Sequence, residues 1–227
     1  MKLIHKDFDF VFHFDENVRS LLVVEDPVIF LKLISEMTGN DREEYSRIVL
    51  SEDDTVLKIK DKLVCIIDPL SISLNDRKLL NKLGDMLLKE ILSSELLIKG
   101  NQIVSDIENY VIQIIQCMDW NLSYSEKIDI QSLLKIAEVR FDDVQETLVE
   151  EILDYIKISS ELLGIKCFVF VNMLSYLTEY EVEKFYEYVY YQKICVLLLE
   201  SRVPDTVKKF SETVIIDKDT CEIVLNV

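Results

Sequence analysis

Glycine, proline and basic residues are scarce in this chain, and each shortage excludes a class of structure or function. Only 4 glycines and 3 prolines occur among 227 residues, so no long flexible linker is expected. Neither GxGxxG nor GxxxxGK followed by Ser or Thr is present, so the phosphate cradle of nucleotide-binding α/β proteins is missing. Lysine and arginine total 25 against 42 aspartate and glutamate residues, a formal charge of −17. Any anion site must therefore be a local cluster of lysine and arginine.

Long apolar runs and paired cysteines are missing as well. No run approaches the roughly 18 residues of a transmembrane helix, and the opening MKLIHKDFDFVF lacks the apolar core of a signal peptide. The five cysteines are odd in number and never spaced as CxxC. Cys65, Cys167 and Cys195 stand in apolar segments, where a free thiol is a small core residue. We therefore expect a reducing cytoplasm and no zinc site.

The stretch from 166 to 202 carries the clearest fold signal. The apolar runs CFVFV and ICVLLL flank an amphipathic segment that starts at Thr178, an N-cap residue followed by acids. This arrangement predicts a βαβ unit in a parallel sheet whose strands are buried on both faces. Asn172 directly follows the first strand, and Glu200 ends the second. Both therefore lie at the carboxyl ends of strands, where parallel sheets usually place their ligand-binding sites. The predicted fold class is α/β with a mostly parallel sheet.

Periodicity divides the chain into three parts. The first holds an N-terminus, MKLIHKDFDFVF, that resembles an edge strand, with a half-exposed strand expected over 8–14. It continues with a strand over 20–24, a helix over 28–37 and two short strands, VLKIK and LVCII, between 56 and 67. Helical periodicity begins after Asn75 and predicts two successive helices, 79–92 and 101–118, with Gly100 as the stop between them. Strand–helix alternation resumes at 139–141, where VRF predicts a short strand. We therefore expect an α/β head over 1–68 and 138–227, with a helical leg of 69–137 inserted into it.

Residues that would indicate catalysis are few. His5 and His13 stand near the N-terminus, away from any recognisable nucleophile. Asp68, Asn172 and Glu200 end three predicted strands but supply only two acids, fewer than a metal-dependent nuclease needs. The chain is therefore expected not to be an enzyme.

Two sets of lysines have spacings that would place each set on one face of its segment. The first set, between 58 and 62, recurs every second residue and would project from one side of an extended segment. The second set, between 78 and 89, falls within about 40° around a helix at roughly 100° per residue. Each set alone is more often a solubilising face than a ligand site, but oligomerisation around an axis would make it a positive zone. The sets are Lys58, Lys60 and Lys62, and Lys78, Lys82 and Lys89.

Four segments, in order, carry a resemblance to a known family. They are SLLVVEDPVIF, LVCIIDPLSISLND, FVFVNMLSYLTEYEVEKFYEYV and VLLLESR. Each is similar to a motif of the short form of the Csn-two family, the accessory subunit of the adaptation module in type II-A CRISPR systems. Ser73 stands where that family has an acid. The matched positions are Glu25, Asp26, Phe30, Asp68, Asn75, Asn172, Leu177, Thr178, Glu181, Val182, Glu187, Tyr188, Glu200 and Arg202.

The resemblance implies a structure and a role that composition alone does not show. It implies a homotetrameric ring of α/β heads and helical legs, in which the head is similar to a P-loop fold that has lost its nucleotide site. Such rings bind double-stranded DNA ends threaded through a lysine-bearing lumen, so the six lysines above become candidate DNA contacts. They act without established catalysis in spacer acquisition, a step of antiviral defence, beside the CRISPR integrase subunits and the RNA-guided nuclease.

The resemblance also implies calcium ions near the leg. Calcium takes six to eight oxygen ligands, several of them carboxylates, and the loop CMDWNLSYSEKID is the candidate segment. Serines at 123 and 125 replace acids that are common in relatives, and a solvated polar loop is the alternative. The candidate ligands are Asp119, Asn121, Glu126 and Asp129.

A second function stays open on the sequence. An acidic scaffold of the adaptation complex would bind basic partner proteins and no DNA. The tyrosine-rich segment 180–191 is a candidate contact for such a partner, although aromatic stripes more often pack in a core or an interface.

Overall fold

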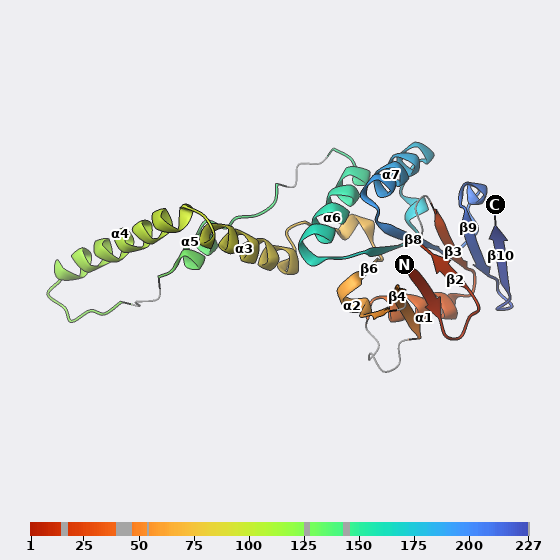
Figure 1. Cartoon of the computed structure of the whole chain (residues 1–227), viewed down its shortest axis with the longest axis horizontal. Coiled ribbons are helices and arrows are strands. Elements are labelled where there is room, and N and C mark those ends of the chain that lie inside the picture. Colours follow the sequence, from red (N-terminus) through yellow and green to blue (C-terminus); the bar gives the residue numbers. More distant parts are fainter. Residues whose placement is uncertain (15–17, 40–46, 54, 125–127, 143–145, 227) are drawn as a thin grey trace. The chain divides into compact units, whose positions relative to one another are not determined.

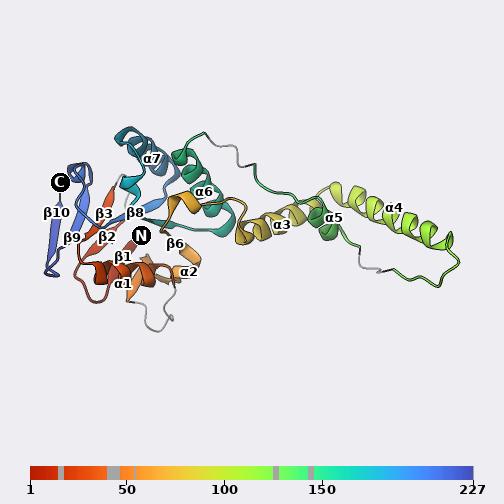
Figure 2. The same cartoon turned by 180° about the vertical axis from the view of Figure 1, so that it is seen from behind.

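The computed structural model describes residues 1–14, 18–39, 47–53, 55–124, 128–142 and 146–226, which form two compact units (Figures 1 and 2). The first unit joins Met1–Ser73 to Val144–Val227, and the second is Leu74–Asp143. The sequence placed the helical insertion at 69–137, so the observed unit begins and ends a few residues further along the chain.

The first unit is built on a six-stranded sheet. Its strands are β3 (Ser20–Val24), β6 (Leu63–Ile66), β7 (Cys167–Val171), β8 (Cys195–Glu200), β9 (Glu212–Ile216) and β10 (Glu222–Asn226). They lie in the order β10-β9-β3-β8-β7-β6, and all neighbours are parallel except β10, which pairs antiparallel with β9. The predicted α/β class with a mostly parallel sheet is therefore confirmed.

The predicted βαβ unit is present as β7, α7 (Glu179–Gln192) and β8. Thr178 begins α7 with a capping box: its hydroxyl accepts a bond from the N–H of Glu181, whose carboxylate accepts one from the N–H of Thr178. This exchange satisfies two backbone donors that a helix start otherwise leaves free. Every residue of β7 is buried, as expected for a strand covered on both faces.

Apolar clusters cover both faces of this sheet. On one face α1 (Pro27–Met37) packs through Leu33 and Met37, and Asp26 caps it by accepting bonds from two backbone N–H groups. On the other face α6 (Leu148–Leu163) and α7 pack through residues such as Ile152 and Phe185. Figure 1 shows α1 on the opposite side of the strands from α6 and α7. The head is therefore a three-layer structure.

A small antiparallel sheet lies in the same unit. Its strands are β1 (Lys2–His5), β2 (Val11–His13), β4 (Ile48–Glu52) and β5 (Thr55–Leu57), in the order β2-β1-β4-β5. Two expectations hold only in part. MKLIHKDFDFVF was expected to resemble an edge strand: β2 does lie at the edge of this sheet, but β1 pairs with both β2 and β4. Alternate residues of β1, such as Leu3, are buried in the core shared with α1. The strand expected over 8–14 is only Val11–His13.

A buried polar pair joins this sheet to α1. The Nε2 atom of His5 lies 2.8 Å from a carboxylate oxygen of Glu36, and both side chains are almost fully buried. The N–H of Asp7 donates to Nδ1 of His5, so Nε2 is the nitrogen that carries the proton toward Glu36. The imidazole of His5 and the carboxylate of Glu36 thus both have hydrogen-bond partners. A buried polar group without a partner would lower the stability of the fold.

One expected strand is shorter than predicted and is followed by a turn of helix. VLKIK was predicted to be a strand, and residues 56–57 do lie in β5, but Ile59–Lys62 forms the short helix α2, with Lys58 at its N-cap. A bond from the N–H of Asp61 to the carbonyl of Lys58 closes the turn. The second strand of this region, β6, then follows directly.

The second unit is helical. Its helices are α3 (Arg77–Leu92), α4 (Leu96–Gln116) and α5 (Ile130–Ile136). Gly100 was expected to stop a helix, but the break lies at 93–95 and Gly100 is inside α4. A Cβ at this position would stand 2.9 Å from Cδ1 of Ile130, so the glycine permits close packing of α4 on α5.

In the second unit, Asn75 bonds to the segment at the far end of the unit, around Phe141. Phe141 donates its N–H to Oδ1 of Asn75 at 2.9 Å, and Nδ2 of Asn75 donates to the carbonyl of Phe141 at 3.1 Å. The side-chain amide of Asn75 thus bonds to both backbone groups of Phe141. The short strand predicted for VRF is not present, since residues 139–141 are irregular. Asp76, next to Asn75, is the residue that caps α3.

The cysteines are free thiols, and three of them lie in the sheet as predicted. Burial raises the pKa of Cys65 to about 12 and that of Cys167 well above its usual range. Both therefore stay protonated core residues.

Among the described residues, no helix is both long and apolar enough to cross a membrane.

Candidate functional site

The carboxyl ends of β7 and β8 meet at one edge of the sheet, and Asn172 joins them. Asn172 adopts a left-handed conformation (φ 52°), which asparagine tolerates better than most residues. Its Oδ1 accepts bonds from both the N–H and the hydroxyl of Ser201, each at 2.9 Å. The segment that follows β7 is therefore fastened to the segment that follows β8.

Glu200 ends β8 and is 4% exposed. Its Oε1 accepts a bond from the N–H of Leu174 at 3.0 Å, in the short helix η3 (Met173–Ser175). Burial raises the pKa of Glu200 to about 7, although the backbone N–H groups of η3 and the charge of Arg202 act in the opposite direction. This carboxyl group is therefore partly protonated at neutral pH.

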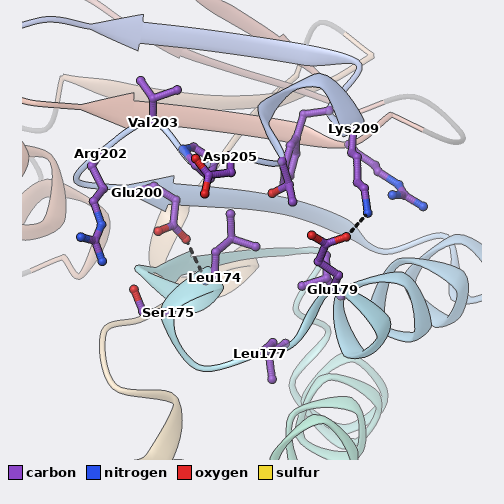
Figure 3. A pocket seen from close by; sticks show the side chains of 14 residues that line it. Leu174, Ser175, Leu177, Glu179, Glu200, Arg202, Val203, Asp205 and Lys209 are labelled. Carbon is purple, nitrogen blue, oxygen red and sulfur yellow. Dashed lines mark hydrogen bonds and ion pairs between the residues drawn. The ribbon is translucent and has the colours of Figure 1, made fainter.

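A pocket of about 500 Å³ opens beside Glu200. It is bordered by η3, by the first turns of α7, and by the segment after β8 that leads through η4 (Val207–Lys209) to β9. Figure 3 shows Glu200 directed toward Leu174, with Arg202, Val203 and Asp205 on the segment after β8. Pockets of about 300–1,000 Å³ are the usual size of small-ligand sites.

Three ion pairs border this pocket, one of which joins Nζ of Lys209 to Glu183 at 3.7 Å. Arg19, which precedes β3, donates two bonds to Glu183 of α7, at 3.1 and 2.7 Å, and its guanidinium lies 4.8 Å from the ring centre of Tyr186. Lys209 donates to Glu179 at 2.9 Å (Figure 3). The bond from Arg19 lowers the pKa of Glu183, and burial raises the pKa of the Tyr186 phenol. The pocket thus has fixed charges of both signs along its wall.

Sequence reasoning found part of this pocket and missed the rest. Asn172 and Glu200 were singled out because they stand at strand ends, and both lie where predicted. Arg19 was missed because only the folded sheet brings it near Glu200. Asp205 was missed because no local pattern marks it, although it stands only five residues after Glu200. The pairing of β3 with β8 is the contact that would have revealed Arg19, and no local pattern encodes it.

The first lysine set does not form the predicted stripe. Because Ile59–Lys62 is helical, the period-two alternation of Lys58, Lys60 and Lys62 no longer places them on one face. Lys62 is half-buried, and its Nζ donates to the carbonyl of Gly164 at 3.1 Å. Lys58 and Lys60 are exposed. Their role in binding DNA stays a prediction.

The second lysine set lies on α3 as predicted. Lys78, Lys82 and Lys89 are all exposed. Lys82 lies 3.9 Å from Asp85, a weak exposed pair of the kind that adds little stability. Three exposed lysines therefore share one stripe of the helix.

The calcium candidates are described only in part. Glu126 lies outside the described residues. The carboxylate of Asp129 caps α5 by accepting bonds from the N–H and hydroxyl of Ser132, at 2.7 and 2.6 Å, and these bonds lower the pKa of Asp129. Asp119 and Asn121 are exposed in the loop before it. In the described part of the chain no three His, Cys, Asp or Glu residues are grouped to hold a metal. Calcium binding stays a prediction.

Comparison with known families decides the relationship that the motifs indicated. A model of the CRISPR-associated protein family Cas_Csn2 matches residues 40–220. The chain belongs to the Csn2 family. Two curated Csn2 proteins are similar to it. The protein from Streptococcus agalactiae is 26% identical over 187 residues, 81% of this chain and 82% of that protein. The protein from Enterococcus faecalis is 32% identical over 76 residues, 34% of this chain and 35% of that protein.

Solved structures add little to the Csn2 assignment. An ADP-bound ATP-binding cassette of an ABC transporter has a TM-score of 0.44 at 12% identity, covering 91% of this chain and 79% of the other. A dimeric ATP-binding cassette with ADP and phosphate has a TM-score of 0.43 at 10% identity, covering 100% and 99%. Both similarities are too low to assign a fold family or an activity.

Proposed function

We propose that this chain is a non-catalytic CRISPR adaptation protein that binds double-stranded DNA ends in the lumen of a homotetrameric ring. Membership of the Csn2 family, over residues 40–220, is the observation that carries the proposal. The role is spacer acquisition in the cytoplasm, beside the CRISPR integrase subunits and the RNA-guided nuclease. The head is a P-loop-like fold without a nucleotide site, supported by the mostly parallel sheet and the missing phosphate-binding sequence.

The helical unit supports assembly into an oligomer. None of the 21 residues of α4 is buried in a single copy of the chain. Large apolar side chains on this helix face solvent, among them Ile98 (76% exposed), Tyr110 (65%) and Ile103 (50%). Exposed apolar surface of this extent marks an interaction site in most soluble proteins. Contact with further copies of the chain would cover it.

The lysines support binding to DNA phosphates. A chain of charge −17 repels DNA as a whole, so binding needs lysines gathered in a restricted zone. The exposed stripe of Lys78, Lys82 and Lys89 on α3 is such a group, and Lys58 and Lys60 are further candidates. Contacts with phosphates carry no sequence information, so the proposed binding is independent of sequence.

The ring-on-an-end proposal is tested with two DNA topologies. Linear and closed-circular duplexes of one sequence are compared in electrophoretic shift assays, while light scattering measures the mass of the protein. We expect a tetramer that shifts the linear DNA alone. A monomer in solution, or equal binding of both topologies, would contradict the proposal.

An acidic scaffold without DNA binding is the second candidate function. The charge of −17 favours it, as do the exposed rings of Tyr180 (68%) and Tyr191 (71%) on α7. A scaffold would hold its CRISPR partners while shifting neither DNA. Pull-down of the integrase subunits by protein that shows no DNA binding at low salt would select it.

A further inference from the structure

Strand β10 is an exposed apolar edge of the six-stranded sheet. It pairs with β9 on one side, and among the described residues no strand pairs with its other side (Figure 1). Its three central residues, Ile223, Val224 and Leu225, are 44%, 55% and 37% exposed. The other edge strands, β2, β5 and β6, have three or four residues, whereas β10 has five. Edge strands are commonly kept from pairing by shortness, charge or proline, and the centre of β10 has none of these.

The hydrogen bonds between β9 and β10 show which backbone groups of β10 point outward. The N–H of Asp217, just after β9, donates to the carbonyl of Cys221, just before β10, at 3.1 Å. Hydrogen-bonded and non-hydrogen-bonded pairs alternate along an antiparallel ladder, so Ile223 and Leu225 bond to β9. Val224 therefore points its N–H and C=O away from β9, as do the residues two positions before and after it. These are the groups to which a further strand would bond.

We propose that β10 pairs antiparallel with β10 of a second copy of this chain, about a two-fold axis at Val224. In this register the two Val224 residues exchange N–H···O=C bonds, and Glu222 lies opposite Asn226 of the second copy. Ile223 lies opposite Leu225, so apolar residues face each other and like charges do not. Any other register pairs fewer residues of the strand.

The symmetry of a tetramer favours a second copy over a strand of another protein. A closed tetramer of D2 symmetry is built from two different isologous contacts, each joining a surface to its own copy. The exposed apolar side of α4 can supply one such contact. The strand β10 is self-complementary about Val224 and supplies the second. In this respect the inference rests on the proposed homotetramer, and it names a contact that joins two heads.

Pairing of β10 should respond to salt in the opposite way to DNA binding. Two chains of charge −17 repel each other, and salt screens this repulsion. The bonds and apolar contacts of the strands do not depend on a charge. Association through β10 should therefore strengthen as salt rises, whereas affinity for DNA phosphates should fall.

Val224→Pro tests the pairing in the full chain. Because the N–H of Val224 points away from β9, proline removes no bond to β9 but blocks the bonds to a second copy. Val224→Thr keeps the N–H and a β-branched side chain, so it is the matched control. Sedimentation velocity should give Val224→Pro half the mass of the unaltered chain and Val224→Thr the full mass. Circular dichroism and urea unfolding check that both variants fold.

A charge swap at the same position tests the register and the identity of the partner. Val224→Lys and Val224→Glu each oppose two like charges across the two-fold axis, so each alone should have half the mass of the unaltered chain. Mixed in equal amounts, the two variants should regain the full mass, because lysine then faces glutamate. This test does not need Val224→Pro to fold.

The masses separate this inference from the proposed ring. A tetramer that Val224→Pro halves supports both, and a dimer that becomes a monomer supports the pairing but contradicts the ring. A tetramer that Val224→Pro leaves intact keeps the ring and overturns the pairing. Failure of the mixed variants to regain mass overturns it as well. A monomeric unaltered chain overturns both proposals and leaves the edge of β10 to a strand of another protein.

Discussion

Single residues at the matched motif positions act mainly by bonding to nearby backbone. Asp26 and Thr178 cap helices, Asn75 holds the backbone of Phe141, and Asn172 holds Ser201. Glu200 does the same for η3, but it is also buried beside a pocket. Its ionisation therefore affects both the bond to η3 and the charge of the pocket wall.

Glu200 should make the stability of the head fall with rising pH. Its folded pKa of about 7 lies above its usual value of 4.5, so the folded chain binds more protons and the unfolded chain fewer. The free energy of unfolding thus decreases as pH rises from about 4.5 to 7. Glu200→Gln keeps an oxygen for the N–H of Leu174 and removes the titration. Relative to this variant, the unaltered chain should lose about 2 kcal/mol between pH 5.5 and 8.

Urea unfolding at several pH values measures this difference. Glu150→Gln, on the exposed surface, serves as the control, and its difference from the unaltered chain should stay flat. A pH-independent difference for Glu200→Gln would show that Glu200 is ionised throughout this range, contrary to the prediction.

Among the elements, the helices show two opposite uses of glycine. Gly84 lies inside α3, and a Cβ there would meet nothing within 4 Å. Gly164 ends α6 in the left-handed conformation (φ 67°), which other residues adopt at a cost. Sequence alone does not distinguish such positions inside a helical pattern.

Substitution by alanine should therefore have opposite signs at these two glycines. Gly84→Ala should raise the free energy of unfolding by up to about 1 kcal/mol, because alanine loses less backbone entropy in a helix. Gly164→Ala should lower it by about 1 kcal/mol through strain at the helix end. Chemical unfolding of both variants under one condition checks the pair. A destabilised Gly84→Ala would indicate that α3 is covered at this position in an assembly.

The elements best predicted from sequence are those whose local signals agree. CFVFV and ICVLLL are continuous apolar runs, and the capping residues Thr178 and Glu181 mark the start of the helix between them. The predicted bounds of β7, α7 and β8 are therefore close to the observed ones. Ile59–Lys62 was misassigned because polar and apolar residues alternate equally well in a strand or in one helical turn. Gly100 was misassigned because its reason, the contact with Ile130, is distant in sequence. The same limit hid Arg19 from the site.

For the whole molecule, the formal charge of −17 is the property that DNA binding must overcome. Apolar α4 favours assembly, and the lysines of α3 favour phosphates once several copies surround them.

Reversing charge at Lys58 and Lys60 should weaken binding to linear duplex DNA. Each lost phosphate contact should also reduce the salt slope of log affinity by about 1. Lys58→Glu/Lys60→Glu is compared with Lys78→Glu/Lys82→Glu and with Lys218→Glu, an exposed control after β9. Affinity is measured by fluorescence anisotropy at several salt concentrations. An effect at Lys218 equal to that at Lys58/Lys60 would show that binding follows net charge and not these residues.

Calcium should bind the loop from Asp119 to Asp129 with modest affinity. Only three of the four candidate side chains carry charge, so backbone carbonyls and water must complete the shell. Asp129→Asn should weaken binding, although it also perturbs the cap of α5, and Asp106→Asn on α4 is the control. Calorimetry with calcium, and with magnesium for comparison, measures the effect. No heat, together with no change in oligomer mass or DNA affinity, would contradict retained calcium binding.

The pairing of β3 has a consequence for the order in which the chain folds. This strand is made early, but its partners are residues 197–200 of β8 and 212–216 of β9. At roughly 5–20 residues per second, the ribosome needs on the order of ten seconds or more to deliver them. Meanwhile the helices of residues 74–143 make short-range contacts and can form at once. The nascent head therefore exposes an unpaired apolar strand, SLLVV, during most of synthesis, which makes it a target for chaperones and for aggregation.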